Sequence, residues 1–189
     1  MILALLLTLA ASAQDLDSTA HSRRPVAGHA VFDLRAGVQT NDLRHAYLCA
    51  EGSPTRWLSL EACGTGSGIL HQSPTPDIAH FRTRVRALGG TVGRLDTDLL
   101  VGVGFAEVQA TADRPGFKFG QAKSADQVEG AGPEASLSLK GRYWTDAGGR
   151  TYISGDLNAG AAIVPSAPTI IGSEGPVVPF AAVTVGLGF

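Results

Sequence analysis

The chain has 189 residues, and its 15 Lys and Arg side chains nearly balance 17 Asp and Glu, giving a net charge of −2. This length predicts one domain, and the charge balance excludes a basic surface for nucleic acid. Charged residues make up 17% of the chain, below the roughly 25% of a typical soluble domain, and glycine is abundant at 24 residues. The composition favours short strands and tight turns over helices.

The amino-terminal stretch has the features of an export signal. Residues 1–13, MILALLLTLAASA, are apolar and uncharged and end in a small-x-small sequence before Gln14, which is the pattern that a signal peptidase cleaves. The run is too short for a helix that crosses a bilayer, which needs roughly 20 residues. We therefore predict a cleaved signal peptide at 1–13. Residues 14–28 follow as a flexible leader, because their polar composition favours disorder.

Eight later segments alternate apolar and polar residues with the period of two that marks a half-buried strand. They cover residues 29–39, 44–52, 57–67, 78–90, 96–110, 133–144, 151–164 and 177–189. In the fifth segment the second face is small rather than polar, since it carries Gly102, Gly104 and Ala106. The alternation predicts an all-β protein.

The chain contains two cysteines, Cys49 and Cys63. An exported chain meets an oxidising compartment, where an even number of cysteines usually forms disulfides. Both cysteines fall on the polar faces of neighbouring predicted strands, which fits a disulfide between them. The sequence has no CxxC or CxxCH motif, and His21, His29 and His45 lack metal-ligand spacing, so we expect neither a metal nor a cofactor.

The connections between the predicted strands alternate in length. Those after the second, fourth and sixth segments are short, whereas those after the third, fifth and seventh are longer and rich in Gly, Pro and Ser; the first connection, at 40–43, is also short. An even strand number with short turns at one end and long loops at the other is typical of outer-membrane barrels. We predict an eight-stranded antiparallel up-and-down transmembrane β-barrel at 29–189, with both termini at the short-turn end.

The polar faces of the predicted strands carry charges of both signs, which can pair inside a narrow lumen, as buried charges must. The predicted lumen network comprises five acids and six bases: Asp33, Glu51, Glu61, Glu134 and Asp156 with Arg35, Arg82, Arg84, Arg86, Lys140 and Arg142. An eight-stranded barrel is just wide enough for side chains to fill it. General diffusion of solutes is therefore not expected.

Aromatic residues gather at the short-turn ends of the predicted strands, namely Trp57, Tyr143, Trp144 and Tyr152. Membrane barrels carry such aromatic girdles at the interface between lipid and water. We therefore predict that these four side chains form one girdle.

The chain ends in AAVTVGLGF, in which Val185, Leu187 and Phe189 share the apolar face and Phe189 is the last residue. This stretch resembles the carboxyl-terminal strand of outer-membrane β-barrel proteins. The resemblance implies that these three residues form an insertion signal read by the barrel assembly machinery.

Residues 14–189 more broadly resemble the small eight-stranded barrels of the outer membrane protein A and X type. That resemblance implies an outer-membrane location among membrane lipid and lipopolysaccharide. It also implies a structural or surface-interaction role, rather than an enzymatic one, through extracellular loops at 111–128 and 165–176. The short first loop and the two wall cysteines depart from the pattern.

Two other functions remain open. A soluble, exported lipocalin-like barrel would face its polar side outward and bind an apolar ligand inside. A lipid-modifying barrel enzyme would need a nucleophile, a base and an orienting acid, for which His71, Ser73, Asp77 and His80 are the candidates. The sequence lacks a GxSxG nucleophile elbow, and Ser and Asp are also ordinary turn residues.

Overall fold

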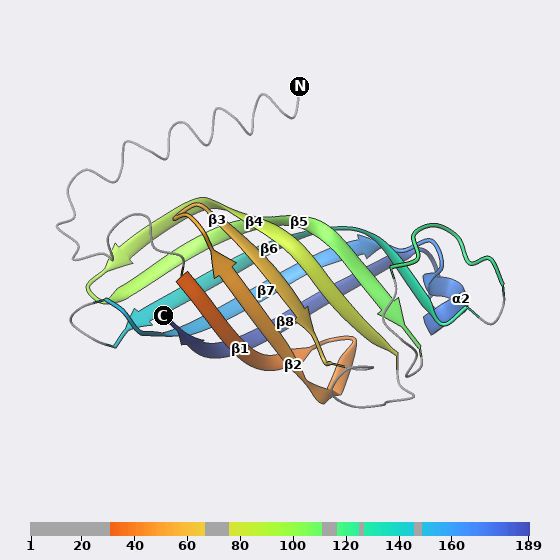
Figure 1. Cartoon of the computed structure of the whole chain (residues 1–189), viewed down its shortest axis with the longest axis horizontal. Coiled ribbons are helices and arrows are strands. Elements are labelled where there is room, and N and C mark those ends of the chain that lie inside the picture. Colours follow the sequence, from red (N-terminus) through yellow and green to blue (C-terminus); the bar gives the residue numbers. More distant parts are fainter. Residues whose placement is uncertain (1–30, 67–75, 111–116, 125–126, 146–148) are drawn as a thin grey trace, which may run out of the picture.

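The computed structural model describes residues 31–66, 76–110, 117–124, 127–145 and 149–189. In this part of the chain, eight antiparallel strands form a closed barrel in sequence order (Figure 1). The strands are β1 (Val31–Gln39), β2 (Asp42–Ser53), β3 (Leu58–Gly64), β4 (Asp77–Val92), β5 (Leu95–Gln109), β6 (Glu129–Trp144), β7 (Tyr152–Ile163) and β8 (Val177–Gly188). The predicted all-β, eight-stranded antiparallel barrel is confirmed.

Closure of the barrel joins the first strand to the last. Leu34 pairs with Leu187 and Val38 with Val183. Beyond the ladder, Phe32 and Phe189 exchange two backbone hydrogen bonds of 2.8 and 2.9 Å. The alternating carboxyl-terminal segment is therefore the strand that closes the barrel, and no edge of the sheet is left unpaired.

β6 begins at Glu129, earlier than the sequence pattern predicts, and Pro133 lies within it. Proline has no N–H to donate and is confined to strand edges or ends. Here the ladder between β6 and β7 starts at Glu134, so Pro133 lies just beyond it. The strand tolerates the proline because Pro133 faces only β5 across a ladder, where it pairs with Phe105.

The barrel has two different ends. At one end, here called the turn end, lie both ends of the barrel domain and the connections β2–β3, β4–β5 and β6–β7; at the loop end lie the other connections (Figure 1). The connection at the loop end between β7 and β8 contains the short helix α2 (Ala167–Ile171), which ends at Gly172 with a positive φ of 67°. No helix of the described residues is long and apolar enough to cross a membrane.

Aromatic side chains at the turn end divide between the two faces of the wall. Tyr143 is exposed on the outer face of β6, and Trp57 is exposed in the β2–β3 turn. Phe32 and Phe189 are also exposed at this end, with their ring centroids 5.7 Å apart. Tyr152 is only 1% exposed, so its predicted place in an outer girdle is wrong. It is the first residue of β7 and points inward, packed over Gly188 of β8, where an added Cβ would meet its ring.

Candidate functional site: the filled lumen and the loop end

Strand alternation places nearly all the charged side chains of the barrel wall inside the barrel. Nine of the eleven residues of the predicted lumen network are buried: Asp33, Arg35, Glu51, Glu61, Arg82, Arg84, Glu134, Lys140 and Asp156. Arg86 and Arg142 lie near the turn end and are half-buried. The lumen therefore holds both signs of charge in a region shielded from water, where each charge needs a partner.

Glu51 of β2 is the centre of the network. Its Oε2 accepts hydrogen bonds from Arg35 Nη1 at 2.6 Å and from Lys140 Nζ at 2.6 Å. Arg84 Nη2 donates to the same oxygen. The three cations come from β1, β6 and β4, so this one carboxylate ties together strands from different sides of the barrel.

A second group lies on the loop-end side of Glu51. Arg82 Nε is 2.9 Å from Glu61 Oε1, and its Nη1 donates to Asn158 Oδ1 at 2.8 Å. His80 is fully buried, with Nδ1 2.5 Å from Glu134 Oε2. These contacts extend the polar filling from β3 and β4 across to β6 and β7.

Asp98 of β5 is a lumen charge that the sequence analysis missed. It is 2% exposed and receives Arg86 Nε and Arg142 Nη1, both at 2.8 Å. It provides the partner for the two half-buried arginines at the turn end. The alternation that placed Gly102 and Gly104 on one face of this strand extends back to Asp98, and that extension was the signal available in the sequence.

The small face of β5 makes room for the arginines of β4. A Cβ on Gly102 would lie 3.4 Å from Arg82 Cδ and 3.6 Å from Arg84 Cγ, and it would overlap Ser136 Oγ. The glycine predicted to give a small rather than polar face therefore accommodates long side chains of the neighbouring strand.

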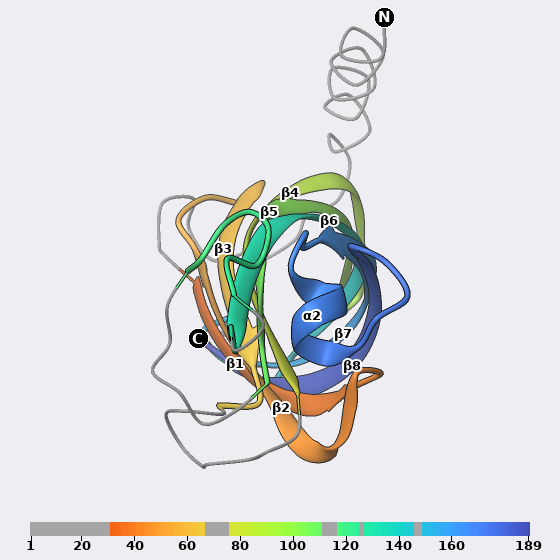
Figure 2. The same ribbon diagram turned by 90° about the vertical axis from the view of Figure 1, so that its right-hand side faces the viewer.

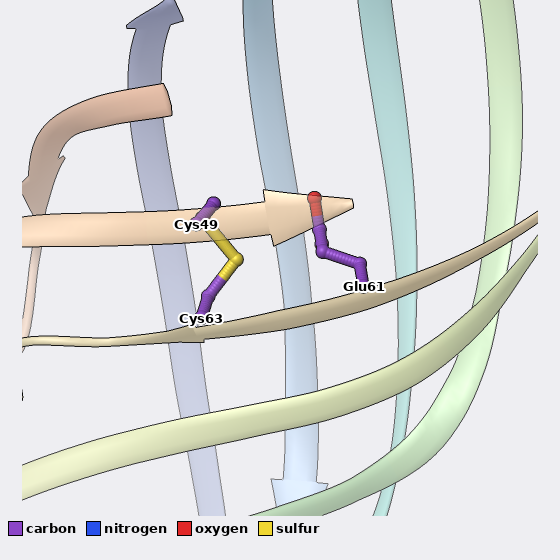
Figure 3. Close-up of side chains that lie close together, drawn as sticks. All are labelled: Cys49, Glu61 and Cys63. Atoms are coloured by element: carbon purple, nitrogen blue, oxygen red, sulfur yellow. A yellow bond between two sulfur atoms is a disulfide. The ribbon is translucent and has the colours of Figure 1, made fainter. Parts of the chain in front are cut away.

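Cys49 and Cys63 are directly opposite each other on β2 and β3 and form a disulfide, with their Cα atoms 4.1 Å apart. The disulfide faces the lumen beside Glu61 (Figure 3). The two sulfurs and a Glu61 oxygen lie within 4.8 Å of one another. Metal ions bind deprotonated thiolates, and both sulfurs are bonded to each other, so this group is not suited to hold a metal.

The loop end of the lumen is filled by apolar side chains. Helix α2 lies in the mouth of the barrel (Figure 2), and its Ala167 and Ile170 pack against buried residues of the strands. This apolar plug consists of Ile78, Ala106, Val108, Ala162, Val164, Ala167, Ile170 and Val178. The polar lumen is thus closed on the loop-end side by hydrocarbon.

Part of the β5–β6 connection packs back on the outer wall. The Phe117 ring lies 5.3 Å from the ring of Phe81 and 5.2 Å from that of Phe105. Lys118, the residue after Phe117, forms a 2.6 Å ion pair with Glu129, and its carbonyl accepts a 2.8 Å hydrogen bond from the backbone N–H of Ala131. This segment of the predicted extracellular loop is therefore fixed to the scaffold.

Within the part of the chain that the structure describes, the candidate residues for an enzyme do not form a catalytic site. Asp77, the first residue of β4, is buried, and its Oδ1 accepts a 2.7 Å hydrogen bond from the backbone N–H of Ile78. His80 Nδ1 is engaged in a hydrogen bond with Glu134 Oε2. His71 and Ser73 lie outside the described residues, as do the predicted signal peptide at 1–13 and the leader at 14–28.

The residues of the predicted insertion signal share the outer wall of β8. Val185, Leu187 and Phe189 are exposed, and Thr184, which precedes them, is buried in the lumen. Recognition of these three residues by the barrel assembly machinery stays a prediction.

The strand pairing and the filled lumen define a small closed β-barrel with a charged interior and an apolar outer wall. The chain is similar to the N-terminal β-barrel domain of Pseudomonas aeruginosa OprF, with a TM-score of 0.46 and 10% identity over 86% of this chain and 98% of that one. It is also similar to Ail, the attachment invasion locus protein of Yersinia pestis, with a TM-score of 0.39 and 8% identity over 85% of this chain and 96% of that one. No protein-family model and no curated protein sequence matches the chain.

Proposed function

We propose that the protein is an outer-membrane β-barrel with a closed lumen, which acts in a structural or surface-interaction role through its loop end. One observation carries the proposal: the wall is apolar outside and charged inside. Soluble proteins rarely expose contiguous apolar surfaces on this scale. Lipid-facing strands of outer-membrane barrels alternate in this sense, apolar outward and polar inward. The exposed outward side chains on the strands include Leu34, Leu60, Val85, Val103, Leu137, Leu139, Leu157, Ile163, Val183 and Leu187.

The export route follows from the same proposal. Residues 1–13 would direct the chain out of the cytoplasm and be removed, and residues 14–28 would remain as a leader at the turn end. Val185, Leu187 and Phe189 would be read by the barrel assembly machinery. Lipopolysaccharide and membrane lipid would then surround the outer wall.

The proposed role lies at the loop end because the lumen offers no open path. Ion pairs centred on Glu51 fill its middle, and the apolar plug fills the loop-end mouth. The described loop segments, 117–124 and 164–176, are held on this rigid scaffold. Segments on a rigid scaffold are well suited to bind a partner.

The two other functions have less support. A carrier of an apolar ligand needs an apolar cavity inside the barrel, whereas here the polar lumen is crossed by ion pairs and its apolar part is filled by α2. An enzyme built on Asp77 and His80 would need these two side chains to act together, whereas His80 Nδ1 contacts Glu134 Oε2 and Asp77 Oδ1 accepts a hydrogen bond from the backbone N–H of Ile78. We therefore propose a non-enzymatic role.

Extraction and gel mobility test the membrane proposal. The mature chain, residues 14–189, should need detergent to stay monomeric and should migrate differently in gels before and after heating, because a closed barrel resists denaturation until heated. A chain that remained monomeric and soluble without detergent would overturn the proposal.

A further inference from the structure

Each of the three connections at the turn end carries one exposed arginine. Arg56 lies in the β2–β3 connection, Arg94 in the β4–β5 connection and Arg150 in the β6–β7 connection. The strands are closed into a barrel in sequence order, so these connections lie two strands apart and spread the three arginines around the rim. Together they are here called the arginine collar.

Backbone hydrogen bonds hold these connections against neighbouring strands. The carbonyl of Trp57 accepts a 2.9 Å hydrogen bond from a backbone N–H of β4. The carbonyl of Arg94 accepts a 3.0 Å hydrogen bond from the N–H of Trp144 in β6. In the β6–β7 connection, the N–H of Thr145 donates a 3.0 Å hydrogen bond to the carbonyl of Thr151. The collar is therefore attached to fixed positions at the ends of the strands.

Exposed apolar side chains flank two of the collar arginines. Trp57 follows Arg56 in the chain and is 58% exposed. Val92 and Leu95, on either side of the turn that contains Arg94, are also exposed. Aromatic side chains and arginine together are typical of the boundary between acyl chains and headgroups, because the apolar groups enter lipid while the guanidinium reaches the headgroups. The collar thus lies where the apolar outer wall ends.

The carboxylates of the described turn end are largely engaged within the barrel. Asp96 accepts hydrogen bonds of 2.6 and 2.8 Å from a threonine hydroxyl and from the Trp144 indole. Asp98 is buried and pairs with the half-buried arginines of β4 and β6. The carboxylate at Phe189 is the exposed anionic group of the described turn end, and Asp146 lies outside the described residues. The exposed rim therefore carries more positive than negative charge.

We propose that the arginine collar binds the phosphate groups of anionic phospholipids in the leaflet that meets the turn end. The inference rests on the proposed membrane location, in which the short turns face the periplasm and the leaflet on that side is built of phospholipid. Arginine forms bidentate hydrogen bonds with phosphate oxygens. Three arginines spread around a rim match separate headgroups of a leaflet better than one soluble ligand. The collar thereby holds this end of the barrel at the membrane surface.

Native mass spectrometry of residues 14–189, released from non-ionic detergent micelles, tests the collar. The probes are dimyristoyl phosphatidylglycerol and dimyristoyl phosphatidylcholine, which share acyl chains and differ in net charge. The parent chain should retain phosphatidylglycerol in preference to phosphatidylcholine. A collar variant, Arg56→Gln with Arg94→Gln and Arg150→Gln, should reduce that preference by roughly fivefold or more, since fivefold is the factor expected for one basic side chain at an anionic lipid surface.

A loop-end variant is the matched control. It removes the same charge from exposed residues at the opposite end of the barrel, through Arg44→Gln, Lys118→Gln and Lys123→Gln. This variant should leave the preference for phosphatidylglycerol intact. Heat-modifiable gel mobility checks that each variant is folded.

Tryptophan fluorescence locates the bound lipid. The chain has two tryptophans, so Trp144→Phe leaves Trp57 as the reporter beside Arg56. In phosphatidylcholine vesicles, brominated phosphatidylglycerol should quench Trp57 more strongly than brominated phosphatidylcholine does. Adding Arg56→Gln should remove that difference, whereas adding Arg44→Gln should not.

Three outcomes would overturn the inference: no preference of the parent chain for phosphatidylglycerol, equal effects of the collar and loop-end variants, or equal quenching of Trp57 by the two brominated lipids. Soluble peptidoglycan fragments serve as a further probe. If the collar variant lost binding of these fragments and kept its lipid preference, the collar would belong to a cell-wall polymer, and the lipid assignment would be wrong.

Detergent dependence of the same preparations separates this inference from the proposed function. A detergent-dependent, heat-modifiable barrel without a lipid preference would contradict the collar alone. A chain that is soluble without detergent would contradict the membrane location as well.

Discussion

The middle of the lumen and its loop-end mouth are filled in opposite ways. In the middle, Glu51 and its three cations hold distant strands together through charge-assisted hydrogen bonds. At the mouth, Ile170 of α2 packs with Val108 and other apolar side chains. The stability of the charged region depends on a well-placed partner for each charge, whereas the stability of the apolar region depends on how completely the side chains fill the available volume. The two regions should therefore respond differently when one side chain is removed.

The largest effect is expected in the charged middle. Glu51→Gln keeps the shape of the side chain but leaves Arg35, Arg84 and Lys140 facing one another without the central negative charge. We expect the free energy of unfolding to fall by about 3–5 kcal/mol, the usual cost of removing one partner from a buried ion pair. Urea unfolding in lipid vesicles, followed by tryptophan fluorescence, measures it.

Glu174→Gln provides the matched control, because Glu174 is exposed in the β7–β8 connection. Its free energy of unfolding should stay within about 0.5 kcal/mol of the parent chain. Equal effects of the two substitutions would show that the network around Glu51 does not stabilise the barrel.

The next effect concerns the covalent link between β2 and β3. Replacing Cys49 and Cys63 together by serine should lower the free energy of unfolding by about 3 kcal/mol, because the disulfide closes a loop of 14-residue separation in the unfolded chain. A reductant should produce a similar loss in the parent chain and none in the double variant. A reductant-sensitive double variant would contradict this explanation.

A smaller effect is expected at the apolar mouth. Ile170→Ala leaves a cavity in the plug, and we expect a loss of about 2 kcal/mol, the lower end for such truncations, because Ile170 lies at the open end of the barrel. Single-channel recording in planar bilayers should show no new conductance, since the charged middle still fills the lumen. A loss as large as that of Glu51→Gln would remove the distinction between the two regions.

Local alternation was sufficient to predict most of the fold. It gave the eight strands, and it separated Leu34 and Val185 on the outer wall from Arg84 and Glu61 in the lumen. The period of a strand is a local property that a sequence displays directly. The pairing of Cys49 with Cys63 also followed from the faces they occupy, although register depends on how whole strands align.

Features that depend on tertiary packing were not predicted. Tyr152 shares the inward face of β7 with Ser154 and Asp156, so the alternation already indicated its direction; its packing over Gly188 depends on the pairing with β8. α2 is a five-residue helix in a proline-containing connection, and its position in the mouth depends on the cavity that the strands leave. The aromatic contacts of Phe117 with Phe81 and Phe105 likewise join segments far apart in the chain.

The most direct test of the central claim is the environment of the outer wall. Leu157→Cys on the outer wall and Glu174→Cys in the β7–β8 connection would each carry a spin label in vesicle-inserted protein, because both native cysteines are bonded to each other. We predict that the label at 157 is accessible to molecular oxygen and shielded from a water-soluble nickel complex, and that the label at 174 shows the reverse. A label at 157 that is freely accessible to the nickel complex would contradict the account.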